Sequence, residues 1–188
     1  MFLIVSKKRA KRKKNSKLKN YWRLLETPSY VDLMTKENKC IGFSKLAKQK
    51  LQDVPLKGTI RQNKNGFVYV EVSNDVIHGL FTLIDEKNIE KPPYFGGKNK
   101  IGAHVSLISD EEIKDHKIEM IEEIGDEIHF SLGEMFSVKP DWKEMERVWF
   151  VEVESQEFID LRQKYGLPKS YKGKRHPYHI TFAVRRKK

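Results

Sequence analysis

The chain carries one structural unit twice, and this duplication limits its fold more than any other feature of the sequence. Residues 67–72 and residues 148–153 both alternate β-branched and aromatic side chains and both end in Val-Glu-Val, which predicts two strands. Each predicted strand is followed by a predicted helix that begins near a serine, Ser73 in the first copy and Ser155 in the second. A polar loop and a further strand complete each copy. Two copies in one chain indicate two similar lobes related by a pseudo-twofold axis.

The last strand of each copy contains a histidine followed two residues later by a hydroxyl residue. These pairs are His104 with Ser106 and His179 with Thr181. Because side chains alternate between the two faces of a strand, both members of a pair share one face, and apolar residues occupy the other. The apolar face is expected to pack into a core. If the two strands are neighbours, two imidazoles and two hydroxyls converge on one cleft.

These four groups suit the cleavage of a phosphodiester. One imidazole can take a proton from the nucleophile while the other, in its protonated form, gives a proton to the leaving oxygen. The hydroxyls can donate hydrogen bonds to the non-bridging oxygens, where negative charge develops. A single His-x-Ser or His-x-Thr would carry little information, but two of them in equivalent places of a repeat carry much more. The chemistry requires no metal.

On these motifs the chain resembles the two-histidine (2H) phosphoesterase superfamily, which includes RNA 2′-5′ ligase-like proteins and cyclic nucleotide phosphodiesterases. The resemblance covers roughly residues 66–184, and the motifs look closest to those of RNA-repair-associated members. It implies an α+β, bilobal fold in which two pseudo-twofold-related lobes with antiparallel sheets flank a central cleft. It also implies that His104 and His179 form the acid/base pair and that Ser106 and Thr181 bind the phosphate.

The chain divides into a basic arm and a folded part. We expect residues 1–20 to be a disordered arm and residues 21–188 to form a single bilobal domain, with repeats over approximately 66–109 and 147–184. Residues 43–51 have the spacing of an amphipathic helix. We expect this helix to cover a sheet of the first lobe, with a contribution to substrate binding as the alternative.

Most of the positive charge lies outside the repeats. The formal net charge is +11, but residues 7–19 carry nine Lys and Arg with no acidic residue, and residues 185–188 carry four more. The residues expected to contact nucleic acid are Lys7, Lys8, Arg9, Lys11, Arg12, Lys13 and Lys14. A block of this kind repels itself and buries little, so it is expected to be disordered alone. It could bind a phosphate backbone, act as a nuclear or nucleolar address, or keep the chain soluble, and the sequence leaves these alternatives open.

Two equivalent loops lead into the histidine strands, and both contain glycine, lysine and an aromatic residue. This mixture can stack a base and neutralise a phosphate, although glycine and lysine are also common in ordinary connections. The candidate substrate contacts are Tyr94, Phe95, Lys98, Lys100, Tyr171, Lys174, Arg175 and Tyr178. Tyr178 can equally pack in the core or form a wall of the pocket. The acidic segment 110–127 is expected to be a solvated face.

Cysteine and hydropathy patterns limit the compartment and the cofactors. Cys40 is the one cysteine, so an internal disulfide is excluded and a reducing compartment is favoured. Zinc is disfavoured because there is no cysteine pair and the histidines lack helical ligand spacing, and no cofactor is expected. The apolar run at residues 1–5 is too short for a signal peptide or a membrane span. We expect an intracellular monomer, cytoplasmic or nuclear, that is neither secreted nor bound to a membrane.

The sequence thus predicts a metal-independent phosphodiesterase that acts on RNA ends or small nucleotides by two-histidine general acid/base catalysis. The scissile group would be a 2′,3′-cyclic phosphate or a 2′-5′ or 3′-5′ linkage, and the sequence does not choose among these or between hydrolase and ligase. The alternative is a non-catalytic RNA-binding module that keeps the 2H fold and uses the basic arm for affinity. A weaker third hypothesis is a structural protein tethered by the arm.

Overall fold

A computed structural model describes residues 43–96, 100–140, 143–173 and 177–188. The predicted arm, residues 1–20, and Cys40 lie outside the described residues. In chain order the elements are α2 (Phe43–Lys50), β1 (Lys57–Gln62), β2 (Val68–Val72), α3 (Asp75–Phe81), β3 (Ile89–Glu90), β4 (His104–Ile108), α4 (Asp110–Asp115), β5 (Glu127–His129), β6 (Ser131–Val138), β7 (Met145–Glu154), α5 (Gln156–Lys164), the 3₁₀ turn η4 (Tyr171–Gly173) and β8 (Tyr178–Arg186). No helix in these ranges is both long and apolar enough to cross a membrane.

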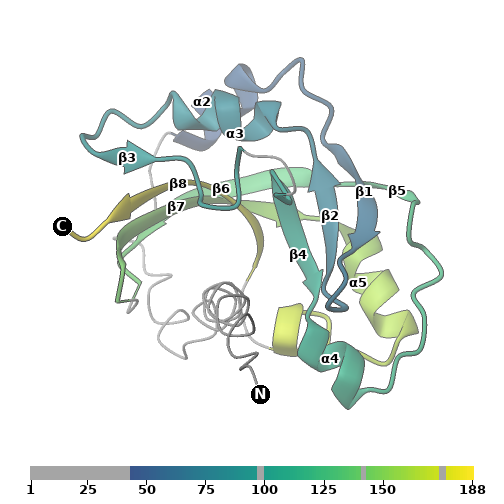
Figure 1. Cartoon of the computed structure of the whole chain (residues 1–188). Helices are drawn as coiled ribbons and strands as arrows, with labels where there is room; N and C mark the ends of the chain where they lie inside the picture. The colour runs from purple at the N-terminus through teal and green to yellow at the C-terminus, as the bar shows by residue number, and fades with distance from the viewer. Residues whose placement is uncertain (1–42, 97–99, 141–142, 174–176) are drawn as a thin grey trace, which may run out of the picture.

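The strands form two antiparallel sheets, which confirms the α+β class (Figure 1). The first sheet has the order β4-β2-β1-β5 and the second the order β3-β8-β7-β6. The histidine strand and the two strands beside it therefore follow the same order in both sheets, β4-β2-β1 and β8-β7-β6. The sheets differ in their fourth strand, because β5 pairs with β1 whereas β3 pairs with β8. A pseudo-twofold axis between two lobes stays a prediction.

A β-bulge follows the hydroxyl residue in both histidine strands. In β4 the register to β2 shifts so that Leu107, directly after Ser106, has no paired residue. In β8 the register to β7 shifts at the equivalent point, so that Phe182, directly after Thr181, has none. A bulge bends its strand and re-aims the side chains beside it. The two copies thus share a local distortion next to their hydroxyls.

Each repeat places its helix against the histidine strand of the other repeat. Helix α3 follows β2 of the first sheet but contacts β8 of the second, and α5 follows β7 but contacts β4. The buried side chains form one hydrophobic cluster that draws on both sheets, including Val70, Val105, Val151 and Ile180. Burial of such side chains stabilises a fold by roughly 1.5–3 kcal/mol each. The two halves therefore share their core.

Helix α2 does not cover a sheet of the first repeat, and that expectation was wrong. It packs on β6 of the second sheet and on α3, as its position above that sheet in Figure 1 also shows. Ala47 and Leu51 are buried against the core, whereas Leu46 is 47% exposed. The helical spacing located the helix correctly. It could not identify the sheet that the helix covers.

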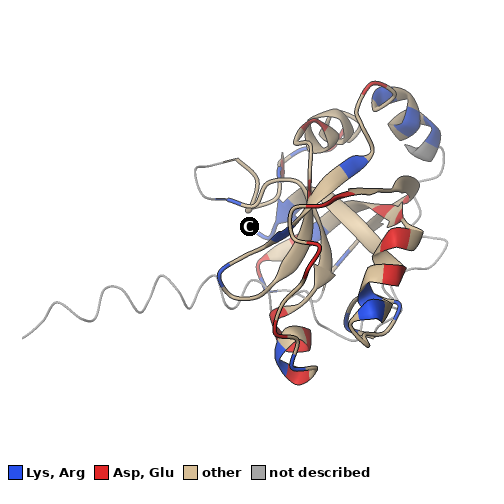
Figure 2. Ribbon diagram, turned by 90° about the vertical axis from the view of Figure 1, so that its right-hand side faces the viewer, with Lys and Arg blue, Asp and Glu red and all other residues tan. Residues whose placement is uncertain are grey.

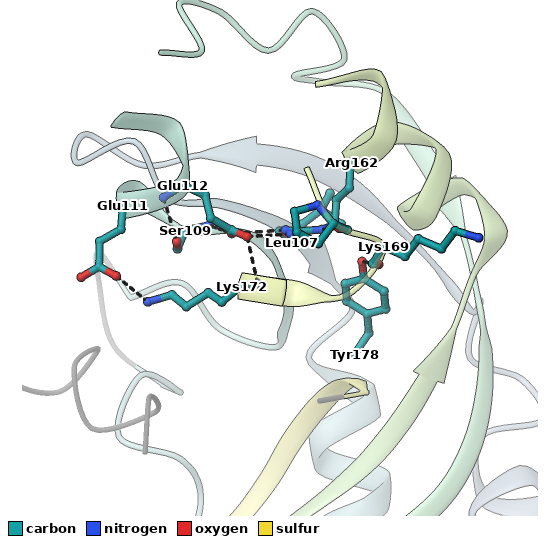
Figure 3. A network of polar contacts seen from close by, with 9 residues as sticks. Leu107, Ser109, Glu111, Glu112, Arg162, Lys169, Lys172 and Tyr178 are labelled. Carbon is teal, nitrogen blue, oxygen red and sulfur yellow. Dashed lines mark hydrogen bonds and ion pairs between the residues drawn. The ribbon is translucent and has the colours of Figure 1, made fainter. Parts of the chain in front are cut away.

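A buried ion pair joins the two halves (Figure 3). The Arg162 side chain of α5 is fully buried, and its Nη2 and Nη1 donate to the two carboxylate oxygens of Glu112 at 2.6 and 3.2 Å. Nη1 also donates to the carbonyl of Leu107, the bulge residue of β4, at 2.6 Å. Nε donates to the carbonyl of Pro168 at 2.7 Å. One guanidinium thus holds α4, the β4 bulge and the loop that leads toward β8.

The acidic segment 110–127 is therefore not wholly a solvated face, because Glu112 within it is only 8% exposed. The carboxylate of Glu112 closes a capping box with Ser109 at the start of α4 and accepts the backbone N–H of Lys172 at 2.9 Å. Lys172 has a left-handed backbone with φ of 54°, and its ammonium contacts the Glu111 carboxylate at 3.0 Å. These contacts hold η4 against α4.

Removal of the Glu112 carboxylate should destabilise the fold strongly. Glu112→Ala leaves the Arg162 guanidinium buried without its counter-ion, and breaking a buried pair in this way costs about 3–5 kcal/mol. Chemical denaturation would measure the change in the free energy of unfolding. Glu111→Ala is the matched control, because its ion pair with Lys172 is half exposed at the carboxylate and should contribute less than about 1 kcal/mol. Equal effects of the two changes would contradict the role assigned to Glu112.

Candidate active site

The two histidine strands lie next to each other. They belong to different sheets, yet β4 and β8 contact one another. The alternation predicted from sequence holds in both, since Val105 and Ile180 are fully buried while Ser106 and Thr181 are partly exposed. The predicted site residues thus lie on the face of each strand that points away from the core. We call these surfaces the histidine faces of the two sheets.

Both imidazoles are held in the same way. The Nδ1–H of His104 donates to the carbonyl of Gly102 at 2.9 Å, and the Nδ1–H of His179 donates to the carbonyl of Pro177 at 3.0 Å. A carbonyl can only accept, so Nδ1 carries the proton in the neutral ring and the lone pair is on Nε2. The backbone two residues upstream therefore sets both the tautomer and the ring orientation. The same device occurs in both copies of the repeat.

The neighbouring strand presents the same kinds of residues to both motifs. The cross-strand pairs are His104 with Glu71, Ser106 with Tyr69, His179 with Glu152, and Thr181 with Phe150. Directly paired residues share a face of the sheet, so a carboxylate stands beside each histidine and an aromatic ring beside each hydroxyl. The ring centroids are 5.8 Å apart for Tyr69 and His104, and 5.0 Å for Phe150 and His179.

Tyr94 connects the two histidine strands. Its ring lies edge-on to His104 with centroids 4.6 Å apart, and its hydroxyl donates to the backbone carbonyl of Thr181 at 3.3 Å. Tyr94 comes from the loop before β4, where the sequence predicted substrate contacts. The structure thus brings this candidate to both motifs at once.

Burial lowers the pKa of both histidines. For His104, which is 6% exposed, burial lowers the pKa to about 4; the hydrogen bond to Gly102 opposes this shift, and the charge of His179 adds to it. For His179 burial also lowers the pKa, against the opposing hydrogen bond to Pro177. Because a charge on His179 affects His104, the two rings are electrostatically coupled. The surroundings favour the neutral form of each ring in the free protein.

The other predicted contacts are dispersed. Phe95 packs edge-on against His78 of α3 at 5.2 Å, and the Lys100 ammonium donates to the carbonyl of Pro93 in its own loop. Tyr171 is half-buried against the core. Lys98, Lys174 and Arg175 lie outside the described residues, as does the basic block Lys7, Lys8, Arg9, Lys11, Arg12, Lys13 and Lys14.

Tyr178 lies in the hydrophobic core. It is 9% exposed, its ring packs edge-on against Phe158 at 5.2 Å, and its hydroxyl donates to the carbonyl of Lys169 at 2.6 Å. Burial raises the pKa of this hydroxyl to about 12, so it remains a donor. Of the two places that the sequence allowed for Tyr178, the structure shows the core.

Sequence reasoning missed the polar residues that share the histidine face of the first sheet. Arg61 pairs with Tyr69 across β1 and β2, and the Arg61 Nε donates to the Glu71 carboxylate at 2.9 Å. Both Tyr69 and Glu71 belong to the predicted strand 67–72. Tyr69 and Glu71 alternate along β2 with the buried valines 68, 70 and 72. Their place on the histidine face could therefore be predicted once β2 was known to pair with β4. Among the described residues no group of His, Cys, Asp and Glu is arranged to hold a metal ion.

The comparisons with known proteins agree with this geometry. The family model described as Swiss Army Knife, 2H phosphoesterase domain, matches residues 68–188, which include both histidine motifs. Neither a search of curated proteins nor a search of solved structures found a match.

Both histidines should titrate below the ordinary value of 6.5, and His104 well below it. NMR of protein labelled in its histidine rings should show His104 with a pKa of about 4 and His179 below 6.5. The folded pKa values lie below the unfolded ones, so this contribution to stability is complete above pH 6.5 and is lost as the pH falls through the folded values. Urea-unfolded protein supplies the reference titration. A ring that titrates near 6.5 in the folded protein would show that it is solvated.

Proposed function

Because the chain belongs to the 2H phosphoesterase family, we propose that it is a metal-independent phosphodiesterase that acts on RNA ends or on small nucleotides. The observation that supports this most is the repeated geometry of the motifs. His104 and His179 each donate Nδ1–H to the carbonyl two residues upstream, and each is followed by a hydroxyl on the same face. Two such imidazoles can supply a base and an acid to one phosphodiester.

The burial of the two rings suggests how they divide the work. A proton on His104 is the more unfavourable, since that ring is 6% exposed whereas His179 is of intermediate exposure. We therefore assign the base to His104 and the acid to His179. In the hydrolysis of a 2′,3′-cyclic phosphate, His104 Nε2 takes a proton from water as the water oxygen bonds to phosphorus. The bond from phosphorus to one ribose oxygen breaks, and that oxygen takes the proton from His179 Nε2.

The hydroxyls of Ser106 and Thr181 are assigned to the phosphate. Each lies on the histidine face two residues after its histidine, on a strand bent by a bulge directly beyond it. A hydroxyl donor placed at a non-bridging oxygen stabilises the charge that develops in the transition state. The paired placement supplies a donor from each strand, so the phosphate would be held between β4 and β8.

Mutation of the four motif residues tests this assignment. His104→Ala and His179→Ala should each lower turnover of a 2′,3′-cyclic nucleotide by about two to four orders of magnitude. The double variant should lose much less activity than the two single losses combined would give, because the two histidines act as a unit. Ser106→Ala and Thr181→Ala should each lower this turnover by about one to three orders of magnitude. Phosphorus NMR of the products, recorded in EDTA, measures each rate.

His116→Ala, at an exposed histidine after α4, is the matched control and should retain the wild-type rate. Loss of activity in EDTA, or a wild-type rate for His104→Ala, would refute the two-histidine mechanism. A wild-type protein that binds RNA but turns over none of the cyclic, 2′-5′ and 3′-5′ linked substrates would favour the non-catalytic RNA-binding module.

The pH dependence follows from the lowered pKa values. Catalysis needs one ring neutral and the other protonated, so kcat/KM should follow a bell whose maximum lies between the two free-enzyme pKa values and therefore below pH 6.5. An anionic phosphate bound between the rings favours their protonated forms, so the kcat profile should lie at higher pH than the kcat/KM profile. Rates measured across pH 3 to 9 would show this. A kcat/KM maximum above pH 7 would contradict it.

A further inference from the structure

A row of side chains leads away from the first histidine motif across three strands. Ser106 of β4 pairs with Tyr69 of β2, and Tyr69 pairs with Arg61 of β1, so all three lie on the histidine face of the first sheet. Strands are about 4.8 Å apart, which places Arg61 about 10 Å from Ser106 along the row. A nucleotide whose phosphate is bound at Ser106 can extend along this row, with its base over Tyr69.

The Tyr69 ring is ordered by its neighbours but remains accessible. It stacks on Phe67 with centroids 5.6 Å apart and an interplanar angle of 16°, and it lies edge-on to His104. Phe67 is 6% exposed, whereas Tyr69 is only partly buried. Phe67 therefore supports one ring that presents its aromatic surface next to the reacting group. Stacking on a fixed ring is a common way to bind a nucleobase.

Polar groups surround this ring. Arg61 and Glu71 form an ion pair at 2.9 Å with side chains 49% and 47% exposed. Burial raises the pKa of the Tyr69 hydroxyl, the charge of Glu71 raises it further, and that of Arg61 lowers it, which places both charges close to the phenol. Guanidinium donors and carboxylate acceptors can together satisfy the edge of a base, which presents both acceptors and donors.

The second copy of the repeat lacks these features. Phe150 occupies the position equivalent to Tyr69; it is fully buried and has no hydroxyl. The carboxylate of Glu152, equivalent to Glu71, accepts a backbone N–H from Glu134 at 3.3 Å. The two histidine faces therefore match at the reacting groups and differ beside them. The polar, accessible aromatic surface belongs to the first sheet.

We propose that Tyr69, Arg61 and Glu71 form a nucleobase subsite beside His104, so that the substrate is a phosphodiester of a nucleoside and its base stacks on Tyr69. This inference rests on the proposed function and names its substrate class. Arg61 and Glu71 read the edge of the base, and Ser106 holds the phosphate. The histidine pair requires no base for its chemistry, so the subsite determines which phosphodiesters are used efficiently.

A matched pair of substrates tests the subsite. One is guanosine 2′,3′-cyclic phosphate, and the other is 1-O-methylribose 2,3-cyclic phosphate, which has the same reacting group without a base. The wild-type protein should prefer the guanosine substrate in kcat/KM by about five- to a hundredfold, the range expected from stacking of one base. Tyr69→Leu should lower this preference nearly to equal use of the two substrates, whereas Tyr69→Phe, which keeps the ring, should keep most of the preference.

Variants of the ion pair test base reading. Arg61→Gln and Glu71→Gln should change the order of preference among the guanosine, adenosine, uridine and cytidine cyclic phosphates. Lys57→Gln is the matched control, since it removes another exposed ion pair of the same sheet, Lys57 with Glu127 at 2.8 Å, and should leave the order unchanged. If all three variants changed the order of preference equally, surface charge in general would set the order, and the assignment of Arg61 and Glu71 to the base would be wrong.

The outcomes separate the subsite from the reaction. Equal kcat/KM for the two wild-type substrates would overturn the subsite and leave the phosphodiesterase intact. If neither substrate is turned over, hydrolysis of 2′,3′-cyclic phosphates fails, and calorimetric titration with guanosine 3′-monophosphate and ribose 3-phosphate decides the subsite instead. The subsite is supported if the wild-type protein binds guanosine 3′-monophosphate more tightly than ribose 3-phosphate and Tyr69→Leu removes this difference. Equal binding of the two ligands to the wild-type protein would overturn the subsite.

Discussion

The Arg162–Glu112 ion pair connects one histidine strand to the segment that leads into the other. A guanidinium placed in a core must have its charge and its donors satisfied, and Arg162 meets this need through α4, the bulge of β4 and the loop before β8. Glu112 in turn holds the backbone of Lys172. The pair therefore links the segment after His104 with the segment before His179. The contact joins helices α4 and α5, which come from different halves of the chain.

The proposed function assigns chemistry to what the duplicated strands share and recognition to what differs between them. Both copies have a histidine whose Nδ1–H donates to the backbone, a hydroxyl, and a bulge directly beyond it. Where they differ, as at Tyr69 and Phe150, one face is polar and accessible while the other is apolar and buried. Under that proposal, the two similar motifs can bind an asymmetric substrate, because the surroundings of the two copies are not equal.

The sequence was informative wherever a local pattern determined the outcome. Period-two alternation correctly assigned Ser106 and Thr181 to the face opposite the buried Val105 and Ile180. The two histidine motifs indicated the family, and the resemblance to that family implied the antiparallel sheets. The side on which α2 packs depends on contacts between elements distant in the chain, so its spacing could not supply it. Glu112 is one acid among many in its segment, and its burial depends on distant partners, Arg162 50 residues away and the backbone of Lys172 60 residues away. The positions of Arg61 and Glu71 became predictable only with the strand pairing.

The exchange of helices between the repeats has a consequence for how the protein is made. Helix α3 packs on β8, and α5 packs on β4, so the contacts that complete each half join segments far apart in the chain. Such topologies fold slowly, because long loops must close before the contacts form. During translation α3 and the strands around it emerge well before β8 exists. Until β8 is made, the apolar surface that it covers on α3 lacks its partner, and exposed surface of this kind makes partly folded chains prone to aggregation.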